Sequence, residues 1–512
     1  MKFKTIISIF VSVLMLGACT DLSETLYDRV QSSDYGKTPG EIETIVGRAY
    51  SSLRGGAADG VNYYPTCEFV FFMTSVASDE CVIPTRTGGD WYDQGVYLQL
   101  QRHTWTADNA KIWAAWKYCY NGIASANSII YQVQQSGLDA ETAQPIYAEI
   151  KGLRAYYYYK LLDIYGNVPL DTSYIVDPVN GLPGTSSRAE VYRFIENELL
   201  ENIEYLPQNA YGRFTKDAAN LLLARLYLNS ETYTGRARWE DCLAACSKIS
   251  GTLEADYFAS FKQDNQNSKE IIFSIPYDGK MGTIGNYLAS MTYHYEQKWA
   301  LSATGNYQWC GNGICAQPGL YSAFEAGDIR RKSILIGPQI DLRTGSAIIM
   351  PASGNPLDYT EEIFNVDEQK PPLEDVAQNC GGRLAKYEDK AGDAWERDYD
   401  MVLMRYAEVL MMQAECYVRL GDQASARPFV EQIRRRAGLD TPESIDLQFV
   451  NEELRREFVF EDHRRTDNIR FGDFFNEWWE KDADPADKHT AIFPIPKPEL
   501  DKNNKLKQNP GY

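Results

Sequence analysis

Apolar residues recur every three or four positions through the first half of the chain, which is the period of an amphipathic α-helix. One face is formed by Ile112, Trp116, Tyr120, Ile123, Asn127 and Ile130. Another helix is predicted after Ser187, because Ser187 and Glu190 have the spacing of a capping box ahead of an apolar stripe. Short polar breaks separate such segments from residue 41 to about residue 249. The pattern predicts stacked antiparallel helix pairs.

A further helix pair is predicted near the C-terminus. Apolar positions run from Leu403 to Val418 in its first helix and from Phe429 to Ala437 in its second, and Gly438 is a natural C-cap. The turn at residues 420–422 resembles the inter-helix turn of a tetratricopeptide repeat. Stacked repeats of this kind bury a continuous core. The fold class predicted is therefore mainly α, with a tetratricopeptide-like scaffold.

The helical period fades between about residues 252 and 398. Gly, Pro, Asn, Tyr and Trp dominate there, and only short strand-like runs such as 271–275 occur. A long irregular stretch inside a helical protein is usually functional or disordered, and the aromatic content argues against disorder. We expect an irregular, loop-rich ligand-binding lobe with short strands.

The first residues have the layout of a secretory signal. Lys2 and Lys4 precede an apolar run over 6–16 that is too short for a lasting membrane span, and small residues then lead to Cys19. The arrangement resembles a bacterial lipoprotein signal in which Cys19 becomes the acylated N-terminus. A plain secretory signal with an incidental cysteine is the alternative.

These patterns divide the chain into five parts. They are a signal peptide at 1–18, a lipid-anchored tether at 19–40, an N-terminal helical half at 41–250 with a binding loop near 78–106, the irregular lobe at 251–398, and a C-terminal helical part at 399–512.

Charge and motif content narrow the function classes. The formal net charge is -20, so the surface repels nucleic acid and suits a neutral or cationic ligand. The 4 histidines are scattered without metal-site spacing, and neither a nucleophile elbow nor a phosphate-binding loop occurs. We therefore expect no enzyme activity and no cofactor. The cysteines are expected to be small buried hydrophobes, with Cys310 and Cys315 the first choice if a disulfide exists.

Several sequence blocks resemble those of a known protein family. They occur in the family's order, and the resemblance extends over nearly the whole chain. The blocks are 153–157, 165–170, 216–227, 405–412, 435–439, 454–465, 495–499 and 508–512. Together they resemble the SusD/RagB family of Bacteroidetes outer-membrane lipoproteins. The resemblance implies about four tetratricopeptide-like units, a surface-exposed lipid anchor in the outer membrane, and capture of nutrient glycans. It also implies a SusC-like TonB-dependent transporter as partner, over which the lipoprotein closes as a lid. Some relatives hold a structural calcium ion.

Candidate ligand-binding residues follow from the chemistry of a neutral glycan. Such a ligand offers apolar ring faces and hydroxyls, so it needs flat aromatic side chains beside polar partners. One loop supplies Trp91 and Tyr92 with Arg86, Asp90 and Asp93. A second segment, 286–309, supplies Tyr287, Tyr293, Tyr295, Trp299, Asn306 and Trp309. With 35 Tyr, 20 Phe and 10 Trp in the chain, most aromatic side chains must belong to the core.

Two alternatives remain from the sequence. One keeps the same architecture but binds peptides, as the RagB branch of the family does. The other, which the residues favour less, is a surface glycosidase or an adhesin.

Overall fold

The computed structural model describes residues 38–176, 181–278, 286–298, 310–341, 344–387 and 399–512. The predictions made for the signal peptide, most of the tether, Cys19, Trp299, Asn306 and Trp309 lie outside these residues.

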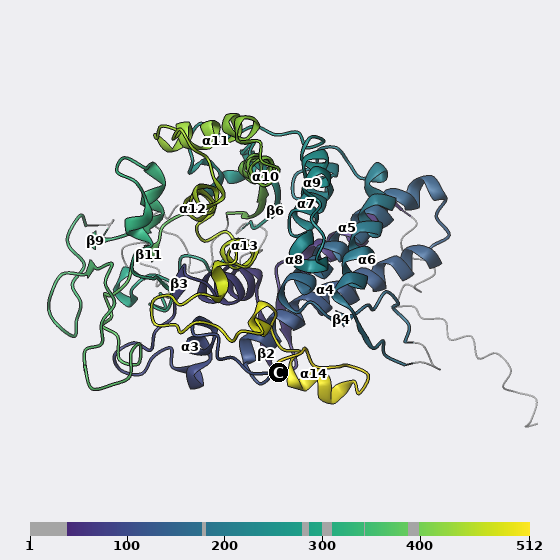
Figure 1. Cartoon of the computed structure of the whole chain (residues 1–512). Helices are drawn as coiled ribbons and strands as arrows, with labels where there is room; N and C mark the ends of the chain where they lie inside the picture. The colour runs from purple at the N-terminus through teal and green to yellow at the C-terminus, as the bar shows by residue number, and fades with distance from the viewer. Residues whose placement is uncertain (1–37, 177–180, 279–285, 299–309, 342–343, 388–398) are drawn as a thin grey trace, which may run out of the picture.

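Stacked helices form the N-terminal half, as predicted (Figure 1). Helix α4 packs against α2 and α5, α5 packs against α6, and α7 packs against α9. The predicted capping box is confirmed, because the Ser187 side chain accepts from the Glu190 backbone while the Glu190 carboxylate accepts from the Ser187 backbone. The bounds are α2 (Pro39–Ser52), α3 (Val96–Gln101), α4 (Ala110–Gln135), α5 (Ala140–Ile164), α6 (Arg188–Asn202), α7 (Lys216–Leu228), α8 (Ser230–Thr234) and α9 (Trp239–Cys246).

The C-terminal helix pair continues this stack, because α10 packs against both α9 and α11. Gly438 ends α11 in the left-handed conformation, with φ of 82°, and its N–H donates to the carbonyls of Arg434 and Arg435, as the C-cap prediction requires. The helices here are α10 (Tyr406–Arg419), α11 (Gln423–Ala437), α12 (Leu447–Glu457), α13 (Arg464–Phe471) and α14 (Lys497–Lys502). The mainly α, tetratricopeptide-like prediction is confirmed.

The start of this pair corrects the sequence analysis. Leu403 lies in strand β12 (Met401–Arg405) and not in the following helix. Strand β12 pairs with β6 (Ile271–Ile275), the run that the sequence did identify as a strand. Apolar spacing alone could not show this, because the partner strand lies more than a hundred residues away.

A buried helix that the sequence analysis missed lies at the centre of the molecule. Helix η1 (Thr66–Val76) has π geometry, and all of its residues are buried. Helices α3, α4 and α13 pack against it (Figure 1). Because the helix is buried on all sides, its sequence does not alternate between an apolar and a polar face, and the helical period could not be recognised.

The described residues contain short antiparallel strand pairs: two lie within the irregular lobe, as expected, two join the lobe to its neighbouring parts, and two lie in the N-terminal half. The pairs are β1 (Gly56–Ala58) with β2 (Val61–Tyr63), β3 (Cys81–Val82) with β7 (Cys315–Ala316), β4 (Val168–Pro169) with β5 (Thr185–Ser186), β8 (Ile334–Leu335) with β11 (Arg383–Leu384), β9 (Gly337–Pro338) with β10 (Asp358–Tyr359), and β6 with β12. The β3–β7 pair brings the predicted binding loop beside the lobe.

The nine cysteines within the described residues are buried and form no disulfide. Cys310 and Cys315 are therefore not bridged, and the interpretation of the cysteines as small buried hydrophobes is confirmed for these nine. Over the same described residues, none of the helices combines the length and the apolar character that a membrane crossing requires.

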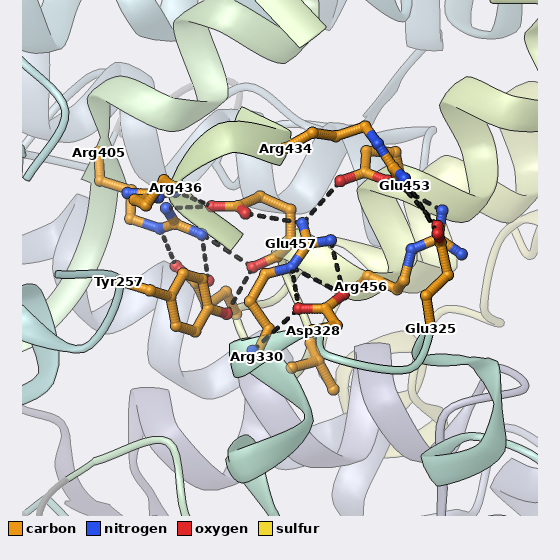
Figure 2. Close-up of polar contacts among 12 residues, drawn as sticks. Tyr257, Glu325, Asp328, Arg330, Arg405, Arg434, Arg436, Glu453, Arg456 and Glu457 are labelled. Carbon is orange, nitrogen blue, oxygen red and sulfur yellow. Dashed lines mark hydrogen bonds and ion pairs between the residues drawn. The ribbon is translucent and has the colours of Figure 1, made fainter. Parts of the chain in front are cut away.

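A network of buried ion pairs fastens the lobe to α12 (Figure 2). Arg330, in the short helix η9 (Ile329–Ser333), lies 2.8 Å from Asp328, 2.8 Å from Glu453 and 3.1 Å from Glu457. Glu457 also pairs with Arg405 at 2.7 Å and with Arg436. Each buried charge has an opposite partner, as burial of charge requires.

Candidate functional site

The predicted binding loop leaves β3 and runs beside a second segment of the lobe. Backbone bonds join Thr85 to Leu373 and Thr87 to Val376, each at 2.9 Å, and the Val376 N–H donates to the Thr85 carbonyl at 2.9 Å. The Arg86–Val376 bridge is parallel. The base of the loop is therefore fixed by long-range backbone pairing.

The Arg86 side chain serves the scaffold, which corrects its prediction as a ligand contact. It is fully buried, and its guanidinium donates to the carbonyls of Asn312, Gly313, Ala377 and Cys380 at 2.8–3.2 Å. Carbonyl oxygens of two lobe segments enclose the charge, so none of it faces a ligand.

A second buried arginine, which sequence reasoning did not single out, completes this scaffold. Arg383 donates to the Asn312 side chain at 2.7 Å and to the Cys380 carbonyl at 2.7 Å. Burial, together with the nearby Arg86 charge, lowers the pKa of Arg383 to about 10. Two like charges side by side are tolerated because backbone carbonyls surround both.

The tip of the loop has an unusual backbone. Trp91, Asp93 and Gln94 have φ of 64°, 37° and 59°, and Gly88 and Gly89 are also in the positive region. Non-glycine residues in this region cost about 1–3 kcal/mol each and persist only where the surroundings hold them. Such strain clusters at functional sites.

Trp91 is held against the lobe. Its indole N–H donates to the Gly311 carbonyl at 2.5 Å, and its ring lies 5.5 Å from the Tyr97 ring. A Cβ at Gly313 would lie 2.5 Å from the indole, so only glycine allows this approach. The side chain is partly buried and rigidly placed.

The second predicted segment meets the loop through a contact that we call the latch, formed by Asp90 and Tyr295. The Tyr295 hydroxyl donates to Asp90 Oδ2 at 2.5 Å, and Asp90 Oδ1 accepts from the Trp91 backbone N–H at 3.0 Å. Partial burial and the hydrogen bond to Asp90 raise the pKa of Tyr295. The latch joins the two segments that the sequence analysis selected independently.

The exposed part of the site is small. Tyr92 is 53% exposed, and Asp90 and Asp93 are exposed as well. Asp93 accepts a hydrogen bond from the Tyr97 hydroxyl at 2.9 Å, which leaves its other oxygen free of any described donor. Tyr92 thus offers an open ring in the same loop as two exposed carboxylates.

Two further predictions are corrected, because Tyr287 and Tyr293 belong to the core. They are 8% and 3% exposed. Tyr287 packs on the Tyr64 ring at 4.8 Å, and Tyr293 lies in a cluster with Cys310 and Tyr359. Neither offers an open face for stacking.

Sequence reasoning missed an exposed apolar pair beside the loop. Phe364 and Val366 are 52% and 59% exposed. They flank Asn365, which bridges Val376, the residue that also pairs with the binding loop. Their spacing in an irregular segment carries no signal of its own, and only the pairing brings them near the site.

The charge at the site is negative. Asp90 and Asp93 face solvent, whereas Arg86 and Arg383 are enclosed. Over the described residues there is no cluster of three or more His, Cys, Asp or Glu side chains that could hold a metal ion. The arrangement suits a neutral, hydroxyl-bearing ligand.

Comparison with known proteins places the chain in a family. The profile of the SusD family matches residues 269–512, and a profile described as starch-binding and associating with the outer membrane matches residues 84–228. The chain belongs to the SusD/RagB family. The starch-binding protein SusD of Bacteroides thetaiotaomicron is 27% identical over 502 residues, which are 86% of this chain and 85% of that protein.

Solved structures have the same fold. Surface glycan-binding protein A from Bacteroides thetaiotaomicron matches with a TM-score of 0.72 at 21% identity, over 93% of this chain and 99% of that one. The same protein in complex with laminarihexaose matches with a TM-score of 0.70 at 20% identity, over 92% and 99%. The helical scaffold and lobe are thus those of SusD-like proteins.

Proposed function

We propose that the protein captures a neutral oligosaccharide or polysaccharide on the loop around Tyr92 and Trp91. The observation that carries the proposal is the latch, which fixes Asp90 in the loop that also carries the exposed Tyr92 and Asp93. Carboxylate oxygens accept hydrogen bonds from sugar hydroxyls, and ring faces stack on the apolar face of a pyranose.

Charge supports a neutral ligand. Asp90 and Asp93 repel sulfate and uronate groups, and the buried Arg86 is saturated by carbonyls. The names of the relatives point the same way, since one is a starch-binding protein and another was solved with laminarihexaose. Both describe binding, so we propose a capture protein and not an enzyme.

Cell-surface anchoring and delivery complete the proposal. Cys19 would carry the acyl chains that hold the protein on the outer membrane, at about 0.8 kcal/mol per buried methylene. The captured glycan would pass to a SusC-like TonB-dependent transporter, over which the protein acts as a lid. The outer-membrane description of the matching family profile supports this location.

Affinity electrophoresis tests the binding site. Residues 20–512 are run through gels that contain soluble starch, laminarin or another neutral polysaccharide, beside the variants Trp91→Ala, Tyr92→Ala, Trp299→Ala and Trp309→Ala. We expect a retarding polysaccharide for the wild type and reduced retardation for the loop variants. Tyr205→Ala is the matched control, because Tyr205 is 48% exposed on the helical half.

If every loop variant is retarded as strongly as the wild type, the ligand binds elsewhere on the protein. Anchoring is tested separately with Cys19→Ala in the full chain, which should release the protein from the membrane fraction. Co-purification of the acylated protein with a TonB-dependent transporter tests whether the protein associates with such a transporter as its lid.

A further inference from the structure

A pocket lies between the α6–α7 connection and strand β6. These elements lie apart from α3, which the binding loop precedes (Figure 1). The pocket volume is about 260 Å³. Polar side chains dominate its wall, including Asn209, Tyr211, Asp217, Gln266 and Lys269. None of these residues takes part in the loop site.

Tyr211 is held at the rim of this pocket. Its hydroxyl donates to Asp400 Oδ2 at 2.7 Å, yet the residue is 60% exposed. The next residue, Gly212, has φ of +66°, and a Cβ there would lie 2.5 Å from Pro276. The close approach to Pro276 fixes the backbone, and Asp400 fixes the far end of the side chain, so an aromatic ring stands open to solvent in one orientation.

Asp400 acts as a support and not as a ligand group. Besides Tyr211, its carboxylate accepts from the Ser274 hydroxyl at 3.2 Å and from the Tyr277 backbone N–H at 3.3 Å. Both oxygens are therefore occupied.

Asp217 has unused capacity to accept hydrogen bonds. It is 5% exposed and receives two long contacts, from the Ser250 backbone at 3.3 Å and from Gln208 at 3.4 Å, both at Oδ1. No described residue donates to Oδ2. The exposed side chains of Asn209, Gln266 and Lys269 also make no hydrogen bond or ion pair with the described residues, so donors and acceptors surround the pocket.

The wall chemistry selects a ligand class. Two carboxylates against one lysine disfavour phosphate and sulfate, and the described residues here include no metal-binding cluster. Amides, hydroxyls, a carboxylate and an open ring suit a neutral polyhydroxylated ligand. The volume is below the range of about 300–1,000 Å³ that holds drug-sized ligands, so one sugar ring fits.

We propose that this pocket is a second carbohydrate subsite that takes one neutral sugar unit, with Tyr211 as the stacking ring and Asp217, Asn209 and Gln266 as hydrogen-bond partners. The proposal rests on the proposed function, since it assumes that the protein binds glycans. A long polysaccharide that touches both sites gains avidity without new contacts at either one.

Hydrogen–deuterium exchange tests the subsite separately from the loop. Residues 20–512 are exposed to laminarihexaose, maltohexaose or the polysaccharide that retards the protein in gels. We expect slower exchange over 209–217 and 265–274, and this protection should persist in Trp91→Ala/Tyr92→Ala. Tyr211→Ala and Asp217→Asn should remove it and weaken polysaccharide retardation about 2- to 10-fold.

Tyr205→Ala is the control, because Tyr205 is an exposed tyrosine on the same connection that does not line the pocket. Protection of the loop without protection of 209–217 would overturn the subsite and leave the proposed function standing. Protection of neither region would overturn both the subsite and the proposed function. Protection of the pocket alone would support the subsite and would show that the loop does not bind the glycan.

Discussion

The binding loop and the ion-pair network of α12 use the same kinds of side chain for opposite purposes. In the network, Glu457 is fully buried and is paired with Arg330, Arg405 and Arg436. In the loop, the exposed Asp90 accepts one side-chain hydrogen bond, from Tyr295. A buried carboxylate that is paired on several sides stabilises the fold, whereas an exposed carboxylate with few partners can still bind a ligand. Four predictions test this difference.

The largest effect is expected for Glu457→Gln. Removing one partner of a buried ion pair leaves uncompensated guanidinium charges, which costs about 3–5 kcal/mol. Denaturant-induced unfolding measures the change in the free energy of unfolding. Glu431→Gln is the matched control, because Glu431 makes an exposed contact with Arg427 at 3.7 Å and should cost at most about 1 kcal/mol. Equal effects of the two variants would contradict the structural role of the network.

The penalty of Glu457→Gln should also depend on pH. Burial opposes ionisation of Glu457, but the charges of Arg436, Arg405 and Arg330 outweigh it and lower the pKa to about 2. A lowered carboxyl pKa stabilises the fold above the unfolded value of about 4.3, and this stabilisation is lost as pH falls toward 2. The difference between wild type and variant should therefore be constant from pH 7 to about 5 and should shrink below that. A difference that grows on acidification would exclude this assignment.

A smaller effect is expected for Gly313→Ala, which tests how the loop is held. The added methyl group collides with the Trp91 indole, and overpacking of this kind costs about 1–3 kcal/mol. Displacement of Trp91 should weaken retardation by the bound polysaccharide while the fold persists in circular dichroism. Gly47→Ala is the control, since a Cβ at that helical position has no atom within 4 Å apart from its chain neighbours and the nearby backbone of its own helix. Unchanged binding would show that the Trp91 position does not matter.

The smallest effect is expected for Asp90→Asn. The variant weakens the latch to Tyr295 by roughly 0.5–1.5 kcal/mol, the typical net value of one hydrogen bond, and so lowers glycan affinity about 2- to 13-fold. Tyr295→Phe should give a similar loss if the latch is what matters. Isothermal titration with the binding glycan measures both variants. A loss in Asp90→Asn alone would mean that the carboxylate contacts the ligand directly.

Local patterns in the sequence were sufficient for much of the fold. The Ser187–Glu190 capping box, the Gly438 C-cap and the strand at 271–275 were predicted and are present. Each is decided by residues within a few positions of one another, through hydrogen bonds or side-chain alternation. The family resemblance rested on such blocks and is confirmed.

The candidate site was predicted only in part. Tyr92, Trp91, Asp90, Asp93 and Tyr295 come together in the loop site, whereas Arg86, Tyr287 and Tyr293 are buried. The residue types gave no means of separating these groups, because a tyrosine in an irregular segment serves a core or a surface equally well. Trp299, Asn306 and Trp309 stay predictions, as does acylation of Cys19.

The helical scaffold, the irregular lobe and the two segments in which ligand contacts were sought could be predicted from the amino-acid order, because periodicity and caps are local properties. The three-dimensional fold was needed to show which aromatic rings face solvent, that Arg86 binds carbonyls of two distant segments, and that Asp90 contacts Tyr295. These depend on contacts between residues more than two hundred positions apart, which no short pattern encodes.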